Sequence, residues 1–186
     1  MIKQIRDFNK VVAITGYRDV QISNVEETLN LIRERLSCVT VQIFNAKLIA
    51  GWEHLYFATL NALLAFKSKT NISKSLAIEC LLYASAHRQI RVAFDLIGIK
   101  PNLTEIAVLI VAENRDVVEN SLSKIPTLIP STRDDSILSL SKEKETHIRR
   151  LFDISDTELA ACYRNGEKKA LLDLVIEHVA ISATHR

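Results

Sequence analysis

The chain has 186 residues, with 24 Lys and Arg against 22 Asp and Glu, and 48% of its residues are hydrophobic. A chain of this length can bury roughly 70% of the surface that its unfolded form exposes, so it can form a core without disulfides or metal. Only four Gly and three Pro occur, which excludes low-complexity and collagen-like architectures. We therefore expect a single domain over residues 1–186, built mainly of regular secondary structure, with two small domains as the alternative.

The first part of the chain predicts a strand, a helix and a second strand. Residues 10–16 form a β-branched run, and residues 38–44 alternate polar and apolar side chains, as a half-buried strand does. Between these strands, Ser23 or Asn24 can cap a helix that continues to residue 36.

The middle of the chain is helical in pattern. Apolar residues recur on one helical face at 52–66, and a polar segment separates this helix from a second one at 73–86. Apolar side chains surround most of the second helix, so we expect it to be central and buried. A third helix is predicted at 88–97, with Gly98 as its stop signal.

A third strand is predicted at 105–112, where apolar residues are continuous after a turn-prone segment. The next helix should start near Asn114 and end before Pro126, because the residue before a proline disfavours helical geometry. A weak fourth strand is predicted at 136–140. The segment 126–135 between them is long enough to form a mobile loop.

The last quarter, residues 141–184, is helical in pattern throughout. Ser155 followed by Glu158 is a capping-box signature, and a further break is indicated at Asn165. The final helix, about 167–183, carries more apolar residues than a single buried face requires. Either this helix fills the core, or it offers an apolar surface to a partner protein.

The chain contains no nucleotide-binding, metalloprotease or hydrolase motif. The adjacent Glu53 and His54 suggest a small metabolic enzyme with acid–base chemistry as an alternative, but a core histidine explains His54 as well. Asp134 and Asp135 offer too few oxygen ligands for a metal, and the apolar surroundings of Cys80 favour a structural thiol. We therefore expect no catalytic residue, no metal and no cofactor.

The cysteines are widely spaced and odd in number, which argues against a disulfide framework. No apolar stretch approaches the roughly 18 residues of a membrane span, and the first residues show no signal-peptide pattern. We therefore expect a protein of the cytoplasm, or also of the nucleus if the source is eukaryotic, that does not bind membranes.

Positive charge is concentrated between residues 67 and 91. In this segment a single acidic residue, Glu79, stands among five basic ones: Lys67, Lys69, Lys74, Arg88 and Arg91. A helix that starts at Ser73 would present free N–H groups to a phosphate. A helix of 14 residues spans about 21 Å, so Arg88 would contact a different part of an extended ligand, such as a nucleic-acid strand. The alternative is an ordinary solvated surface.

The residues around this segment are similar to those of a known family. They read VQIFNAKLIAGWEHLYFATLNALLAF (41–66), TNIS (70–73) and AIECLLYASAHRQIRVAFDLIGIK (77–100), followed by the closing segments KEKETHIRRLFDIS and LLDLVIEHVAI. In this ordered succession the chain resembles the kinase-binding and tRNA-binding subunit of the KEOPS (EKC) complex, the CGI/TPRKB family. The resemblance covers nearly the full chain.

The resemblance implies an α/β (α+β) domain with a small, largely antiparallel sheet packed with helices, and no catalysis of its own. It implies a regulatory subunit that binds the small atypical kinase/ATPase of KEOPS, and the other subunits through this kinase. It also implies that the protein recruits tRNA through the single-stranded 3′ CCA end for threonylcarbamoyladenosine modification. Proteins bind such single-stranded ends with Lys and Arg together with flat side chains.

The resemblance implies that the tRNA-facing candidates lie in the basic segment of this chain: Lys67, Lys69, Asn71, Lys74, Arg88 and Gln89. The amide of Gln89 suits a base edge, whereas Tyr83 belongs to the apolar helix and is expected in the core. The candidates for kinase binding lie on the final helix: Leu171, Leu174, Val175 and His178. A kinase-binding scaffold without tRNA affinity remains as an alternative.

Overall fold

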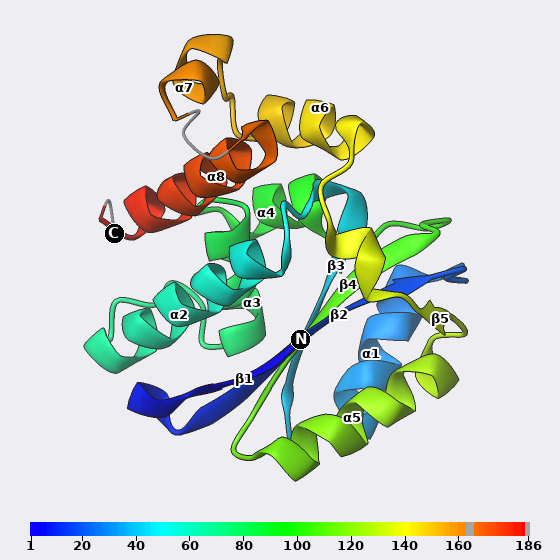
Figure 1. The fold of residues 1–186 in the computed structure, drawn as a ribbon. Helices are drawn as coiled ribbons and strands as arrows, with labels where there is room; N and C mark the ends of the chain where they lie inside the picture. Colours follow the sequence, from blue (N-terminus) through cyan, green and yellow to red (C-terminus); the bar gives the residue numbers. More distant parts are fainter. Residues whose placement is uncertain (163–165, 185–186) are drawn as a thin grey trace. The chain divides into compact units, whose positions relative to one another are not determined.

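The computed structural model describes residues 1–162 and 166–184 (Figure 1). Contacts divide the chain into two compact units, each made of two separate segments. The sheet unit comprises Met1–Ala46 and Ile99–Ile137, and the helical unit comprises Lys47–Gly98 and Leu138–Arg186. The elements make an α+β fold with a small antiparallel sheet, as predicted. The expectation of a single domain over the whole chain stays a prediction.

Within the described residues, five antiparallel strands form the sheet, in the order β1-β2-β4-β3 with β5 paired to β2. They are β1 (Ile2–Ile5), β2 (Lys10–Arg18), β3 (Thr40–Asn45), β4 (Glu105–Ala112) and β5 (Thr132–Arg133). β4 is almost entirely buried, which explains its continuous apolar sequence. The strands predicted at 10–16, 38–44 and 105–112 are confirmed.

Two helices, α1 (Val25–Arg35) and α5 (Arg115–Leu128), lie on the same side of the sheet (Figure 1). Both begin with an asparagine cap. The Oδ1 of Asn24 accepts the N–H of Glu27 at 3.2 Å, and the Oδ1 of Asn114 accepts the N–H of Val117 at 3.0 Å. Their apolar sides pack with alternate residues of β2 and β4 to form the core of the sheet unit.

The prediction that the helix after Asn114 ends before Pro126 is wrong. α5 includes Pro126 and continues to Leu128. A proline removes one N–H donor, and its ring crowds the carbonyl four residues back, but the N–H of Ile129 still donates to the carbonyl of Ile125 at 2.8 Å. In the last turn, the surrounding helix therefore tolerates this residue.

The strand predicted at 136–140 is also wrong. This segment begins with the 3-10 helix η3 (Asp135–Leu138). The Asp134 carboxylate accepts the N–H and the hydroxyl of Ser136, at 3.0 and 2.6 Å, and this local pattern turns the chain. The segment 126–135, expected as a loop, contains the end of α5 and strand β5.

The described part of the helical unit contains α2 (Trp52–Ser68), α3 (Leu76–Ala84), α4 (Ile90–Ile97), α6 (Lys142–Leu151), α7 (Asp156–Ala161) and α8 (Glu167–Thr184). Two further 3-10 turns, η1 (Arg6–Phe8) and η2 (Ala46–Leu48), connect elements earlier in the chain. α2 contacts both α3 and α8. Its small residues Ala58, Ala62 and Ala65 are buried, which permits close packing.

The structure confirms most of the predicted helices of this unit. Six of the nine residues of α3 are buried, as expected of a central helix, and Gly98 follows α4 directly. The capping box of Ser155 and Glu158 is present at the start of α7. The helix predicted at 73–86 starts later, at Leu76, and the break predicted at Asn165 lies outside the described residues. None of the helices in the described ranges has the length and hydropathy of a membrane span.

Candidate nucleic-acid interface

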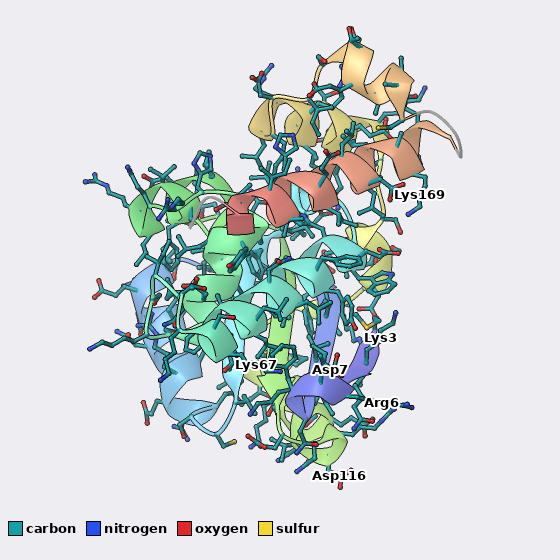
Figure 2. All side chains as sticks on the ribbon, turned by 90° about the vertical axis from the view of Figure 1, so that its left-hand side faces the viewer. Lys3, Arg6, Asp7, Lys67, Asp116 and Lys169 are labelled. Carbon is teal, nitrogen blue, oxygen red and sulfur yellow. The ribbon has the colours of Figure 1, made fainter. Side chains whose placement is uncertain are left out.

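The first group of candidate residues lies where α2 ends. Lys67 is exposed in the last turn of α2, where Figure 2 labels it. Lys69 follows in the left-handed conformation, with a φ of 58°. Its N–H donates to the carbonyl of Phe66 at 3.3 Å, and the N–H of Thr70 donates to the carbonyl of Ala65 at 2.9 Å. Such helix ends usually have glycine in the left-handed position. Here that position carries a cation at the negative end of the helix dipole.

A buried carboxylate holds the turn between α2 and α3. Glu79, in the first turn of α3, is 0% exposed. Its oxygens accept the N–H of Ile72 at 3.1 Å and the N–H of Ser73 at 2.9 Å. The Nδ2 of Asn71 donates to the carbonyl of Ser73 at 3.0 Å, and Lys74 is exposed. The expectation that a helix starting at Ser73 offers free N–H groups to a phosphate is therefore wrong.

The second group of candidate residues lies between α3 and α4. Ala86 adopts the left-handed conformation, with a φ of 54°, and the N–H of His87 donates to the carbonyl of Leu82 at 3.1 Å. This pattern ends α3. Arg88 and Gln89 follow and are exposed. Gln89 is the N-cap residue of α4, but its side chain makes no capping hydrogen bond, so α4 does not use its amide.

The candidates thus form two groups at opposite ends of α3. Near its N-terminus lie Lys67, Lys69, Asn71 and Lys74, and beyond its C-terminus lie Arg88 and Gln89. α3 has nine residues rather than fourteen, so it spans about 14 Å. The single acidic residue of the segment 67–91 is buried, and all five cations are exposed. We refer to Lys67, Lys69, Lys74, Arg88 and Arg91 as the basic surface.

His54 is a structural residue of the helical unit. Its side chain is fully buried, its Nδ1 accepts the N–H of Ala50 at 3.3 Å, and its Nε2 donates to the carbonyl of Ala84 at 2.8 Å. Burial lowers the pKa of His54 to about 4. The ring is therefore neutral near pH 7, and backbone groups occupy both nitrogens. This arrangement disfavours proton transfer between His54 and the adjacent Glu53.

The remaining titratable candidates also have structural partners. Cys80 is buried in α3, and burial raises the pKa of its thiol to about 12. The Asp135 carboxylate accepts the N–H of Gly16 at 3.0 Å and a guanidinium N–H of Arg133 at 2.9 Å. In the described part of the chain, no three His, Cys, Asp or Glu side chains are grouped so that they can hold a metal ion.

The kinase-binding candidates lie on α8. Leu171, Leu174 and Val175 are 1%, 6% and 0% exposed and belong to the core of the helical unit. His178 is half-buried, and its ring lies 5.9 Å from that of Phe152. The burial of the three aliphatic residues favours the alternative in which they fill the core. A role of α8 in kinase binding stays a prediction.

Sequence reasoning missed two features of the interface. The first is the role of Glu79, which stands out in the sequence only as the single acidic residue of a basic segment. Its position inside an apolar helix was an available signal, because a buried charged residue requires hydrogen-bond partners. Ile72 and Ile90 are each 40% exposed beside cations at the two ends of α3. Hydrophobicity alone assigns such residues to the core, so only the structure identifies them as surface residues.

The titratable candidates His54, Cys80 and Asp135 thus have structural surroundings, whereas the cations of the basic surface are exposed. The chain matches the family of the kinase binding protein CGI-121 over residues 17–183, and it belongs to this family. It is 35% identical over 141 residues to the regulatory protein Cgi121 of Methanocaldococcus jannaschii, a match that covers 76% of this chain and 83% of that protein. The resemblance found in the sequence is confirmed.

Proposed function

We propose that this protein is a non-catalytic regulatory subunit of the KEOPS complex. In this role it binds the small atypical kinase/ATPase of the complex, contacts the other subunits through this kinase, and acts in the cytoplasm. Two findings support a kinase as the partner. The CGI-121 family is described as kinase binding, and the relative is named a regulatory protein. The structural role of His54 supports a function without catalysis.

The protein also recruits tRNA through its 3′ CCA end for threonylcarbamoyladenosine modification. The observation that carries this proposal is the basic surface, which is exposed at both ends of α3 and has no exposed acid between residues 67 and 91. A single-stranded end offers phosphates to Lys and Arg and unstacked bases to amide and apolar side chains. Gln89, Ile72 and Ile90 lie among these cations and provide such groups.

To test this proposal, we would measure the affinity of the protein for full-length tRNA and for the same tRNA without its CCA end. Both measurements are made at two salt concentrations. We expect tighter binding of the intact tRNA, with an affinity that falls as salt rises because counterions are released. The double variant Lys67→Glu and Arg88→Glu should lose this binding.

The matched control is Arg35→Glu with Lys124→Glu, because these residues are exposed on α1 and α5 and the change in net charge is the same. This control should bind intact tRNA nearly as well as the wild type. Equal binding of the two tRNAs, or equal loss in both double variants, would leave a kinase-binding scaffold without specific tRNA affinity as the better description.

The kinase is proposed to bind on the exposed side of α8, which includes Glu177 and Ala180. Leu174→Arg is a poor test, because Leu174 is buried and the variant should unfold. Ala180→Arg adds bulk at an exposed position of α8, and Ala160→Arg does the same on α7 as a control. We expect only Ala180→Arg to reduce co-elution with the kinase. Unchanged co-elution of Ala180→Arg would exclude this side of α8.

A further inference from the structure

The turn between α2 and α3 depends on one buried side chain. Glu79 accepts the N–H groups of two successive residues, Ile72 and Ser73, and bonds Ile72 with both of its oxygens, at 3.1 and 3.3 Å. Two further hydrogen bonds of the turn are local ones, from Asn71 to the carbonyl of Ser73 and from the N–H of Ser75 to the hydroxyl of Ser73. A polar segment of this kind has little apolar burial to order it, so the carboxylate supplies its main anchor.

This turn carries part of the basic surface. Lys69 precedes it in a left-handed conformation, and Asn71 and Lys74 belong to it. A flexible turn would have to lose conformational freedom when a ligand binds, and that loss lowers affinity. An anchored turn holds these side chains in place before binding.

We propose that Glu79 is a positioning residue of the nucleic-acid interface. The proposal rests on the function proposed above. Glu79 itself is 0% exposed, so its carboxylate is not on the surface that a ligand would meet. It acts through the N–H groups of Ile72 and Ser73, which it holds so that Asn71 and Lys74 meet the same ligand as Lys69.

A purely electrostatic role and a positioning role of Glu79 predict opposite changes in tRNA affinity when this residue is replaced. Glu79→Gln removes a negative charge from beneath a cationic surface, and electrostatics alone then predicts tighter binding of a polyanion. Gln has only one acceptor oxygen in place of two, so the anchor of the turn weakens, and positioning predicts weaker binding. The sign of the effect therefore separates the two roles.

The experiment compares tRNA binding by the wild type, Glu79→Gln and Asp95→Asn. Asp95 is exposed on α4 near Arg91, so its variant removes the same charge without touching the turn. We expect Glu79→Gln to bind about 5-fold more weakly than the wild type, and Asp95→Asn to bind at least as tightly. The salt dependence of Glu79→Gln should be shallower by about 0.7 in slope for each phosphate that the variant no longer neutralises.

Hydrogen exchange gives a readout that does not depend on tRNA. The amides of Ile72 and Ser73 should exchange faster in Glu79→Gln, while the amides of α8 stay unchanged. If Glu79→Gln does not fold, Glu79→Asp replaces it, because the shorter side chain keeps the charge but reaches less far. Unchanged exchange at Ile72 and Ser73 overturns the proposal.

The binding data distinguish failure of this inference from failure of the proposed function. If the wild type binds tRNA and Glu79→Gln binds equally well or more tightly, the positioning role is wrong and tRNA recruitment stands. If the wild type binds no tRNA, the proposed function fails, and the role of Glu79 in it fails as well.

Discussion

At the scale of single residues, the fully buried polar side chains His54 and Glu79 both bond backbone groups of the helical unit. Burying a polar group without a hydrogen-bond partner costs free energy. Buried polar side chains such as these are therefore found where backbone groups provide the partners. The carbonyl that His54 bonds belongs to Ala84, 30 residues further along the chain. The sequence is compatible with a core histidine at position 54, but it does not identify this partner.

Acid should destabilise the protein through His54. Burial lowers the pKa of His54 from 6.5 to about 4. Between these values the unfolded chain binds a proton that the folded protein does not bind. The free energy of unfolding should therefore fall by up to about 3 kcal/mol as the pH drops through this window, with no further loss from His54 below it.

Urea unfolding at about pH 7 and about pH 4.5 measures this effect. His54→Gln should lose most of the pH dependence in this window, whereas His87→Gln, at an exposed histidine, should keep it. Equal pH dependence in the wild type and His54→Gln would contradict the assignment.

Ala86→Gly should stabilise the protein by about 0.5–1 kcal/mol. Ala86 has a φ of 54°, and the left-handed conformation costs roughly 1–2 kcal/mol for a residue with a Cβ atom. Part of this gain is offset by the greater chain entropy of glycine when unfolded. The free energy of unfolding measures the difference.

Ala180→Gly provides the control for this prediction. Ala180 is an exposed residue within α8, so a glycine there should destabilise the protein by about 1 kcal/mol. If both changes destabilise the protein to the same extent, the strain assigned to Ala86 is absent.

At the scale of secondary-structure elements, three α-helices in the described ranges are followed by a left-handed residue other than glycine. This residue is Lys69 after α2, Ala86 after α3 and Asp153 after α6, and in each case the next N–H bonds a carbonyl five residues back. The chain has only four Gly, so its composition gives no signal for these helix ends. Hydrophobic periodicity predicts where the helices lie, whereas local hydrogen bonds determine where they end.

The short elements show the same limit. β1 has four residues and β5 has two, and edge strands of this length carry too few side chains for a periodic pattern. The segment 136–140 resembles a strand in sequence because Ile137, Leu138 and Leu140 are apolar. The hydrogen bonds of Asp134 with Ser136 decide its conformation instead.

Pro126→Ala should raise the free energy of unfolding by about 1 kcal/mol. Pro126 is exposed inside the last turn of α5 and cannot donate to the carbonyl four residues back. Alanine restores this hydrogen bond, which outweighs the entropy that proline removes from the unfolded chain. Chemical denaturation measures the change, with Lys124→Ala as an exposed control in the same helix. A loss of stability in Pro126→Ala would contradict this account.

At the scale of the whole molecule, each compact unit combines two segments that are distant in sequence. Neither unit is a continuous stretch of chain, so neither has the boundaries of an independent sequence domain. The length and composition of the chain also favour a single domain.

We therefore expect one cooperative unfolding transition. The single tryptophan, Trp52, belongs to the helical unit and its fluorescence reports on that unit, whereas far-ultraviolet circular dichroism reports on both. In urea the two signals should give the same midpoint. Two separated midpoints would show that the units unfold independently and that the single-domain prediction is wrong.

The amino-acid sequence by itself determined the long helices, the three main strands, the family and the position of the basic segment. These follow from local periodicity, charge and an ordered succession of residues, all of which can be read along the chain. Only the tertiary structure decided the strand order, the burial of Leu171, Leu174 and Val175, and the use of the Ser73 N–H by Glu79. The physical reason is that exposure and hydrogen-bond partners depend on which segments meet in space, and a pattern along the chain does not contain that information.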